Sequence, residues 1–479
     1  MRESNTVERW PMYIGGKPRQ TPQVRDVVDP GTNTVVASVS LGHRDDALEA
    51  VRVAEKGAVT AAHMPAHEKM RILRDCSELV LKESEGLADL ITQESSKTIR
   101  EARKEVMRCI DTLRLSAEEA RRIAGEVIRF DQAEGSESRI GYWDRGPVGI
   151  VTAITPFNDP LNLVAHKVGP AIAGGNAVIL KPSNETPLSA LRFAHLLYEA
   201  GLPGDMLSVI TGDARDIGET IISHPAVRMV SFTGGLKTGL TITRQAGLKK
   251  LSMELGSNSP VIILSDADLE RAVEATVTGT FWAAGQNCLG VQRIFVENRV
   301  YDEVKERLVA RTEMIRTGDK RLETTDMGPL INEREVLRVE SWVQDVINRG
   351  GQILTGGYRD GNFYAPTLLD RVPHGAVVLE EEVFGPVACL IPVPNLTSAI
   401  AQANNVNYGL QAGVFTRDIQ QAFTAVRELQ VGGVMINDSS DYRIDAMPFG
   451  GVKGSGIGRE GVRFTVESMT EPKVVCINL

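Results

Sequence analysis

The stretch Val148-Gly-Ile-Val-Thr-Ala-Ile154, followed by Thr-Pro-Phe-Asn-Asp-Pro160, decides the fold. A short apolar run that ends in turn residues is typical of a buried strand. A helix is expected to follow and to end at Gly174-Gly175, and the next predicted strand is Ala177–Lys181. Because strand, helix and strand alternate, the sequence predicts an α/β fold with a parallel, doubly wound sheet, whose ligand binds at the carboxyl ends of the strands.

The same alternation extends outward from this unit. A second series of strands and helices begins at Pro260–Leu264 and continues to about residue 445. Its first helix is expected to be capped by Ser265 or Asp266, since both side chains can accept a bond from a free helical N–H group. Upstream, residues 45–120 have apolar positions at three- to four-residue spacing, which predicts amphipathic helices.

Two segments stand apart from this pattern. Residues 125–145 contain strand-like runs around a polar loop, and the strand-like tail Val474–Leu479 could pair with them. Such an arm has strand edges to cover, so a homodimer or homotetramer is expected. The predicted parts are a cofactor-binding domain of residues 1–120 and 146–253, a catalytic domain of 254–445, and an oligomerisation arm with the C-terminal segment, 121–145 and 446–479.

Composition narrows the function class. A net charge of −9 and a pI near 5.5 argue against a nucleic-acid-binding surface. No run of about 18 apolar residues is present, so no membrane span is expected. The five cysteines are scattered without metal-ligand spacing, which indicates neither a disulfide framework nor a metal site. We expect a cytoplasmic protein.

One cysteine lies in a distinctive setting. The stretch Thr278–Arg293 is a helix-like run of small and apolar residues that ends at Gly285 and is followed by Cys288. A thiol on such an exit turn suits a nucleophile with a backbone oxyanion donor beside it. The alternative is a buried structural cysteine, since free Cys is among the most buried residue types.

Two further side chains suit the same chemistry. Glu254 ends a largely apolar strand, where burial would raise the pKa of its carboxyl toward that of a general base. Asn158 follows the strand Val148–Ile154, where its amide could donate to an oxyanion. The alternatives are a structural carboxylate held by backbone N–H groups and a turn-forming Asn.

Two strand ends suggest a dinucleotide site. Lys181-Pro-Ser183-Asn184 places a cation after one strand, and Ser231-Phe-Thr-Gly234-Gly235 places a glycine turn before a helix. Free N–H groups at a helix start bind phosphate. This is not the GxGxxG fingerprint, so an ordinary tight turn is an equal alternative.

Seven motifs together resemble the NAD(P)-dependent aldehyde dehydrogenase superfamily in order and spacing. The likeness covers nearly the whole chain and is greatest to the branch of lactaldehyde, succinate-semialdehyde and phosphonoacetaldehyde dehydrogenases. The motifs are Phe157-Asn158, Lys181-Pro182-Ser183, Phe232-Thr233-Gly234, Glu254-Leu255-Gly256, Gly285-Gln286-Asn287-Cys288, Glu381-Glu382-Val383-Phe384-Gly385-Pro386 and Pro448–Gly456.

The resemblance implies a Rossmann-type cofactor domain and a mechanism. Cys288 would attack the aldehyde, Asn158 would stabilise the oxyanion, and Glu254 would activate water to hydrolyse the thioester. Lys167 and Glu471 would have supporting roles. The implied cofactor-binding residues are Thr155, Pro156, Phe157, Lys181, Ser183, Asn184, Phe232, Thr233, Gly234, Gly235, Leu255, Gly256, Glu382 and Phe384.

The chain departs from the family pattern at two cofactor positions. Asn184 replaces a glutamate common in NAD-preferring members, which removes a charge that would repel a 2′-phosphate. We therefore predict that NADP is accepted, alongside NAD. Gly235 replaces a common serine and so leaves pyrophosphate contact to the backbone.

The substrate is expected to be a small polar aldehyde. Arg108 matches an anion-binding arginine of phosphonoacetaldehyde dehydrogenases, although it could equally be a solvated helix residue. Asp159 and Asn287 stand where those enzymes have basic residues, and the charge of Asp159 would repel a second anion nearby. A hydroxy- or carboxy-aldehyde is therefore favoured over a phosphonate.

Two other functions remain open on sequence alone. A thioester or ester hydrolase could use Cys288 and Glu254 without redox chemistry. A catalytically silent, oligomeric binding protein is the other, but it would have no need to keep Cys288, Glu254 and Asn158 together.

Overall fold

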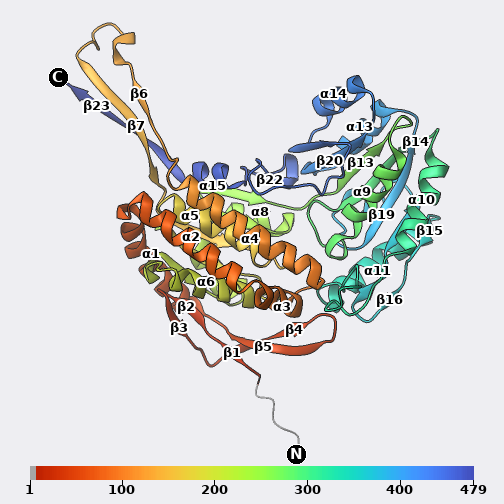
Figure 1. The fold of residues 1–479 in the computed structure, drawn as a ribbon, viewed down its shortest axis with the longest axis horizontal. Coiled ribbons are helices and arrows are strands. Elements are labelled where there is room, and N and C mark those ends of the chain that lie inside the picture. Colours follow the sequence, from red (N-terminus) through yellow and green to blue (C-terminus); the bar gives the residue numbers. More distant parts are fainter. Residues whose placement is uncertain (1–6) are drawn as a thin grey trace, which may run out of the picture.

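The computed structural model describes residues 7–479, and two large sheets with a projecting arm organise it (Figure 1). The first sheet has a parallel centre and antiparallel edge strands. Its eight strands are, in spatial order, β22 (Gly456–Ile457), β12 (Lys250–Glu254), β11 (Val227–Thr233), β8 (Ile150–Ile154), β9 (Ala177–Lys181), β10 (Leu207–Val209), β2 (Met12–Ile14) and β3 (Lys17–Arg19).

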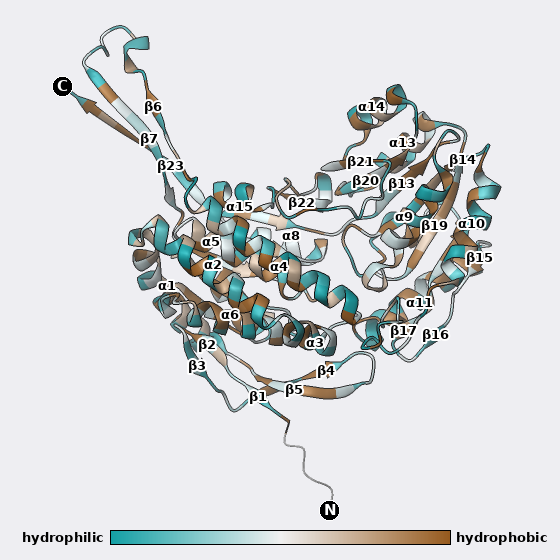
Figure 2. Ribbon diagram, viewed as in Figure 1, coloured by the Kyte–Doolittle hydropathy of each residue, from teal (hydrophilic) through white to brown (hydrophobic). Residues whose placement is uncertain are grey.

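Helices cover both faces of this sheet. One face is packed by α2 (Ala66–Lys82), α3 (Ser84–Glu94), α4 (Ile99–Glu119), α5 (Asn162–Ala173) and α6 (Leu188–Glu199). The other face is packed by α1 (Arg44–His63), α7 (Glu219–Ser223) and α8 (Leu236–Ala246). Figure 2 shows hydrophobic and hydrophilic residues alternating along these helices, as is typical of helices with one buried face. The predicted doubly wound α/β fold is confirmed.

The order of strands in this sheet reverses between β8 and β11. From β8 the chain proceeds to β9 and β10 on one side, and then returns to place β11 and β12 on the other. At such a switch point the two following loops separate and leave a crevice at the carboxyl ends of the strands. This crevice is where a cofactor is expected.

A second sheet of seven strands lies beside the first. Its strands are β15 (Gln352–Thr355), β18 (Thr367–Asp370), β19 (Val387–Val393), β14 (Val291–Glu297), β13 (Ser259–Ile263), β20 (Gln411–Phe415) and β21 (Gly433–Ile436), and only β15 is antiparallel. Helices α9 (Leu269–Phe281), α10 (Tyr301–Glu313), α11 (Glu333–Asn348) and α12 (Val377–Glu380) pack one face, and α13 (Leu396–Asn404) and α14 (Ile419–Glu428) pack the other.

The predicted cap of α9 is wrong. Asp268, rather than Ser265 or Asp266, accepts a bond from the Arg271 N–H group at 3.2 Å. The Asp266 carboxylate instead accepts bonds from the N–H groups of Arg417 and Asp418 and so ties the loop before α14.

The expected pairing of the tail with the 125–145 segment is present. Strand β23 (Thr470–Asn478) runs antiparallel to β7 (Arg139–Pro147), which also pairs with β6 (Glu126–Ile128). Figure 1 shows these three strands projecting from the body of the molecule. Strands β1 (Arg9–Trp10), β5 (Thr34–Ser40) and β4 (Val24–Asp29) form a further small sheet, β16 (Arg359–Asp360) pairs with β17 (Phe363–Tyr364), and α15 (Val462–Ser468) precedes β23.

Strand β22 brings part of the C-terminal segment, Gly456–Ile457, into the first sheet. We keep the domain division as a proposal. Among residues 7–479, no helix has the length and apolar character needed to span a membrane.

Candidate active site

Cys288 lies three residues after a strained segment of the chain. Helix α9 ends in a 3₁₀ segment, Trp282–Gly285, in which Ala283 and Ala284 have φ of 49° and 56° and Gly285 has φ of 68°. A side chain at Gly285 would collide with the backbone of Gly385. A left-handed backbone conformation at alanine costs conformational energy. It is found where the surrounding structure holds it in place, often at functional sites.

The nucleophile position has a free donor beside it. The turn is closed by the Gly290 and Leu289 N–H groups, which donate to Asn287, whereas the Cys288 N–H group has no acceptor among residues 7–479. The Asn158 side-chain amide likewise has no hydrogen-bond partner within that range. Asn158 and Cys288 both line one cavity of about 360 Å³. Two unengaged donors beside a thiol suit the binding of an oxyanion.

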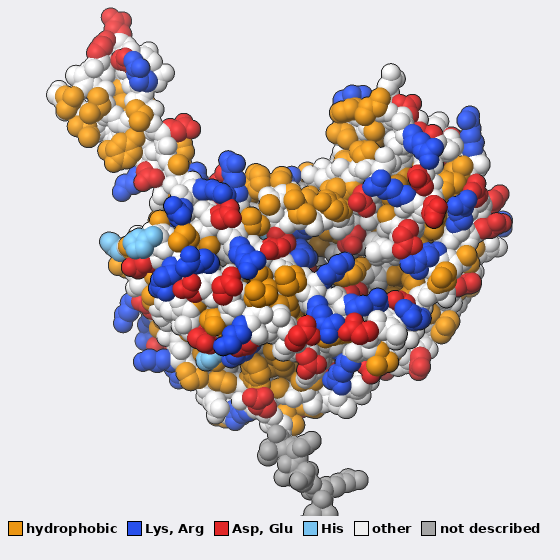
Figure 3. All heavy atoms as spheres, viewed as in Figure 1, with side chains coloured by type: hydrophobic (Ala, Val, Ile, Leu, Met, Phe, Trp, Pro, Cys, Tyr) orange, Lys and Arg blue, Asp and Glu red, His pale blue; other side chains and the backbone are white. Residues whose placement is uncertain are grey.

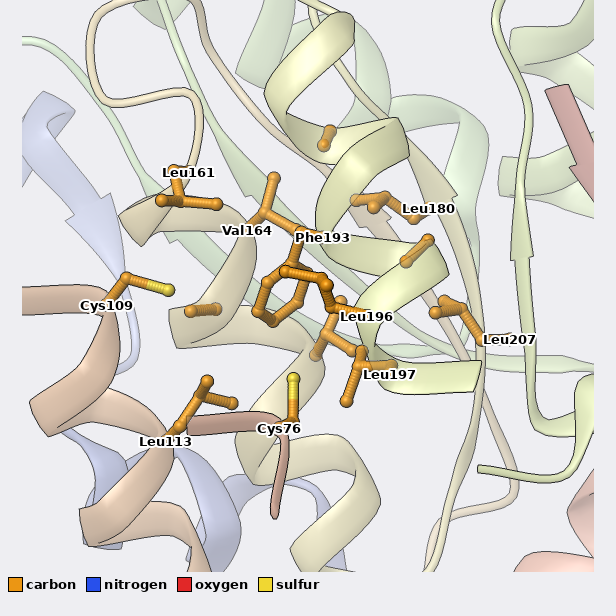
Figure 4. Close-up of a cluster of buried hydrophobic side chains, with 14 of the residues drawn as sticks. Cys76, Cys109, Leu113, Leu161, Val164, Leu180, Phe193, Leu196, Leu197 and Leu207 are labelled. Carbon is orange, nitrogen blue, oxygen red and sulfur yellow. The ribbon is translucent and has the colours of Figure 1, made fainter. Parts of the chain in front are cut away.

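The thiol of Cys288 differs from the other cysteines. Cys76 on α2 and Cys109 on α4 are buried in the apolar core among Leu113, Phe193 and Leu197 (Figure 4). Cys288 is half-buried against Leu289, Leu410 and Phe449. Burial raises the pKa of the Cys288 thiol, as do the charges of Glu382 and Glu254, while Arg443 lowers it.

Glu254 has the setting of a general base. Its carboxylate, at the carboxyl end of β12, is 3% exposed and neither oxygen has a partner within residues 7–479. Burial raises the pKa of this carboxyl well above its ordinary value, and the Glu460 charge raises it further. A side chain at Gly450 would approach Glu254 Oε1 to 3.0 Å, so that glycine leaves space on this side of the carboxylate.

Lys167 is paired with a carboxylate that was not predicted. Its ammonium donates to Glu460 Oε1 at 2.9 Å and to Ser231 Oγ at 3.0 Å, and both ionic side chains are fully buried. Although burial opposes it, the charges of Lys167 and Arg443 lower the pKa of Glu460 to about 2.

The supporting role expected of Glu471 is wrong. Glu471 is exposed and pairs with Lys250, which begins β12, whereas Glu254 ends that strand. Glu460 occupies the place beside Glu254 and Lys167 instead. The only signal for it in the sequence was its position shortly after the Pro448–Gly456 motif.

One face of α4 supports the loops around the cavity. Lys97, just before the helix, pairs with Asp159 and with Glu105. The Glu105 carboxylate accepts bonds from the N–H groups of Leu161 and Asn162, at the start of α5. The loop that follows Asn158 is therefore held by Glu105 of α4 and by Lys97, just before that helix.

Arg108 also lies on this face, and its charge is already matched. The guanidinium pairs with Asp445 at 2.8 Å and with Asp159 at 3.3 Å. The expectation that Asp159 would repel an anion is therefore wrong. Lys97 and Arg108 pair with its carboxylate and neutralise its charge. Asn287 does line the cavity, where its amide contacts the Asp441 carboxylate.

Arg443 is a cavity residue that sequence reasoning missed. Its side chain is 7% exposed, pairs with Glu460 at 3.4 Å and lies over the Phe449 ring at 3.8 Å. Its Nε–H group is buried and has no partner within residues 7–479. No motif marks this position, so only the packing of the chain identifies it.

The crevice between β8 and β11 fits a nicotinamide dinucleotide. The hydroxyls of Thr155 and Thr233, at the ends of these two strands, are buried without partners within residues 7–479. Helix α8 begins after Gly235 without a side-chain cap, and open space surrounds that glycine. These groups can donate to phosphate and ribose oxygens. Phe232 and Gly234 lie at the end of β11, and Leu255 follows the adjacent strand β12.

The far end of the crevice has a second polar anchor. Glu382 accepts a bond from the Ser257 N–H group at 2.8 Å, and burial raises the pKa of its carboxyl to about 7. A side chain at Gly256 would collide with this carboxylate. Phe384 packs edge-on against Phe157, beside Pro156, with ring centroids 5.6 Å apart.

Lys181, Ser183 and Asn184, the residues expected at the adenosine end, lie at or just after the carboxyl end of β9. Lys181 Nζ donates to Asn184 Oδ1 at 3.3 Å, and burial lowers the pKa of this ammonium to about 8. Ser183 accepts a bond from the Glu185 N–H group. The Asn184 amide donates to Asp213 at 3.0 Å, so a carboxylate lies here although position 184 lacks one.

The family is settled by comparison with known proteins. The model of the aldehyde dehydrogenase family matches residues 17–475. The chain belongs to this family. It is therefore an NAD(P)-dependent oxidoreductase acting on aldehydes, as the resemblance implied.

Individual relatives are similar over nearly their full length. Aspartate-semialdehyde dehydrogenase 1 of Pseudomonas canavaninivorans is 46% identical over 95% of this chain and 96% of its own. The 3-sulfolactaldehyde dehydrogenase of Priestia aryabhattai is 43% identical over the whole of both chains. Aldehyde dehydrogenase 21 of Physcomitrella patens, solved with the reaction product succinate, is 38% identical, covers 99% of each chain and has a TM-score of 0.96.

Proposed function

We propose that this aldehyde dehydrogenase oxidises a small aldehyde that carries a second, anionic group, and that Cys288, Asn158 and Glu254 perform the chemistry. The observation that carries the substrate class is Arg443, a buried cation of the cavity whose Nε–H group lacks a partner within residues 7–479. A buried donor without an acceptor destabilises the folded protein by its desolvation free energy, and a bound anion would remove this penalty. The names of the three relatives described above agree with this class, because each contains a compound with a second acidic group.

The first step forms a bond between Cys288 Sγ, as the thiolate whose proton has passed to solvent, and the aldehyde carbon. The carbonyl electron pair moves to oxygen, and the resulting oxyanion accepts bonds from the Asn158 amide and the Cys288 N–H group. When bound, the nicotinamide supplies the acceptor for the hydride of that carbon, and the product on Cys288 is a thioester.

The second step releases the acid. Glu254 removes a proton from water, the hydroxide adds to the thioester, and the carbon–sulfur bond breaks with its electrons returning to Cys288. The raised pKa of Glu254 makes it a stronger base than an ordinary carboxylate near neutral pH. The Lys167–Glu460 pair adjoins Glu254, so we assign it the supporting role.

The test compares Arg443→Gln with the unchanged enzyme on matched aldehydes, one ending in a carboxylate and the other of equal length ending in a methyl group. A bond from Arg443 to the anion predicts that kcat/KM for the charged aldehyde falls about 10- to 100-fold, since charge-assisted hydrogen bonds contribute about 1.5–3 kcal/mol. The neutral aldehyde should lose clearly less, because it loses only the influence of Arg443 on Cys288 and Glu460. Equal losses on both would contradict the proposal.

A cysteine-dependent hydrolase is the second candidate, because Cys288 and Glu254 suffice for it. It predicts hydrolysis of small thioesters with no nicotinamide reduction by any aldehyde of the panel. Reduction of NAD or NADP by the charged aldehyde would remove this candidate.

We also propose that the arm of β6, β7 and β23 joins copies of this chain into a homodimer or homotetramer. Val127, Ile140, Tyr142 and Val474 on these strands are exposed, and Figure 3 shows apolar patches on the arm and over α14. Val127→Asp should shift the mass measured by light scattering toward the monomer.

The proposed compartment is the cytoplasm. All five cysteines are free thiols, and a reducing environment would keep the nucleophile in the form that its role requires.

A further inference from the structure

The N-terminal strand β4 brings an arginine to the adenosine end of the cofactor crevice. Arg25 donates to Asp213 Oδ1 at 2.8 Å, and the Asn184 amide donates to the same oxygen at 3.0 Å. Asn184 in turn accepts a bond from Lys181 at 3.3 Å. Four side chains from three distant segments thus form one continuous polar chain.

The charges in this chain act on one another. After burial, the largest influences on the pKa of Lys181 are Asp213, which raises it, and Arg25, which lowers it. The side chains of Arg25 and Asp213 are 36% and 43% exposed, so both can be reached by a ligand. Two cations and one carboxylate therefore surround the place where the adenosine ribose would lie.

The Asp213 carboxylate affects whether NAD or NADP is favoured. Asn184 removes the family's usual negative charge, but Asp213 supplies another within hydrogen-bond distance of that amide. A 2′-phosphate beside Asp213 alone would be repelled, whereas a ribose hydroxyl would find an acceptor. Acceptance of NADP thus requires a group that offsets Asp213.

We propose that Arg25 is a specificity-determining residue for the 2′-phosphate of NADP, and that Asp213 is its counterpart for the 2′-hydroxyl of NAD. When a phosphate is present, Arg25 turns from Asp213 to the phosphate, which it can bind through two N–H groups. When NAD is bound, Arg25 stays on Asp213 and that carboxylate accepts from the ribose. This inference rests on the cofactor crevice proposed above.

The test measures binding without turnover. Calorimetry would give Kd for 2′,5′-ADP and for 5′-AMP, and for NADP and NAD, with the unchanged enzyme and with Arg25→Gln and Asp213→Asn. We expect Arg25→Gln to weaken both 2′-phosphate ligands at least tenfold and the other two by less than twofold. Asp213→Asn should strengthen the 2′-phosphate ligands and weaken NAD. Arg349→Gln is the matched control, because Arg349, just after α11, pairs with Asp345 at closely similar exposure.

The outcomes distinguish an error in the role of Arg25 from an error in the location of the cofactor crevice. If the unchanged enzyme binds cofactors but Arg25→Gln alters both ligand classes equally, or neither, Arg25 only ties β4 to the neighbouring loop and the inference is overturned. If the unchanged enzyme binds none of the four ligands, the cofactor crevice itself is wrong and the inference falls with it.

Discussion

Lys167 and Glu460 form a 2.9 Å ion pair with side chains that are 0% and 1% exposed, although 293 positions separate them in the chain. The pair lies beside Glu254, whose pKa the Glu460 charge helps to raise. This buried pair should contribute both to the stability of the fold and to catalysis, because its removal alters the packing and the charge around the proposed base, Glu254.

Glu460→Gln should destabilise the protein strongly, since it leaves Lys167 charged and buried without its partner. The expected loss in the free energy of unfolding is about 3–5 kcal/mol, measured by urea denaturation. Glu471→Gln is the control, because its exposed pair with Lys250 should contribute no more than about 1 kcal/mol. Equal losses in the two variants would show that the buried Lys167–Glu460 pair contributes no more to the free energy of unfolding than the exposed Lys250–Glu471 pair.

Glu254→Gln should stop the second half of the reaction while leaving the first. Loss of a general base lowers turnover by about 10²- to 10⁴-fold. A rapid burst of reduced nicotinamide, followed by a slow steady state, and a mass increase on Cys288 would report the stalled thioester. Full turnover in this variant, without acyl-enzyme, would remove Glu254 from the mechanism.

The raised pKa of Glu254 also predicts a dependence of stability on pH. The native state holds this proton more tightly than the unfolded chain, where the pKa is about 4.3. The stabilisation is complete below that value and is lost as pH rises toward the folded pKa. The free energy of unfolding of Glu254→Gln, relative to the unchanged protein, should therefore increase from about pH 5 to about pH 8. A difference that stays constant across this range would contradict the raised pKa.

Glu101 should act as a positioning residue for Cys288. Its buried carboxylate accepts a bond from the left-handed Ala283 N–H group at 2.7 Å. Glu101→Ala should relax this turn, lower kcat about tenfold or more and slow alkylation of Cys288, while KM for the cofactor stays within about twofold. Glu85→Ala, which removes an exposed carboxylate paired with Arg103, should change neither. A loss of stability without slower alkylation would make Glu101 purely structural.

Much of this protein could be predicted from local sequence. The Val148–Ile154 strand, the helix ending before Gly174 and the β9 strand ending at Lys181 follow from apolar runs and turn residues, because secondary structure and its punctuation depend mainly on near neighbours. The turn carrying Cys288 was also recognised from its small residues and glycine. Family membership followed from the order of such local motifs.

The partners of the charged side chains depended on tertiary structure. Glu460 rather than Glu471 meets Lys167, Arg443 enters the cavity without any motif, and Arg25 reaches Asp213 from a separate sheet. Asp159, interpreted alone as a repelling charge, is neutralised by Lys97 and Arg108. Electrostatic interactions depend on distance and burial in space, and these are set when remote segments pack together. The sequence by itself therefore determined the fold and the reaction class, whereas packing decided which charges surround the reacting groups.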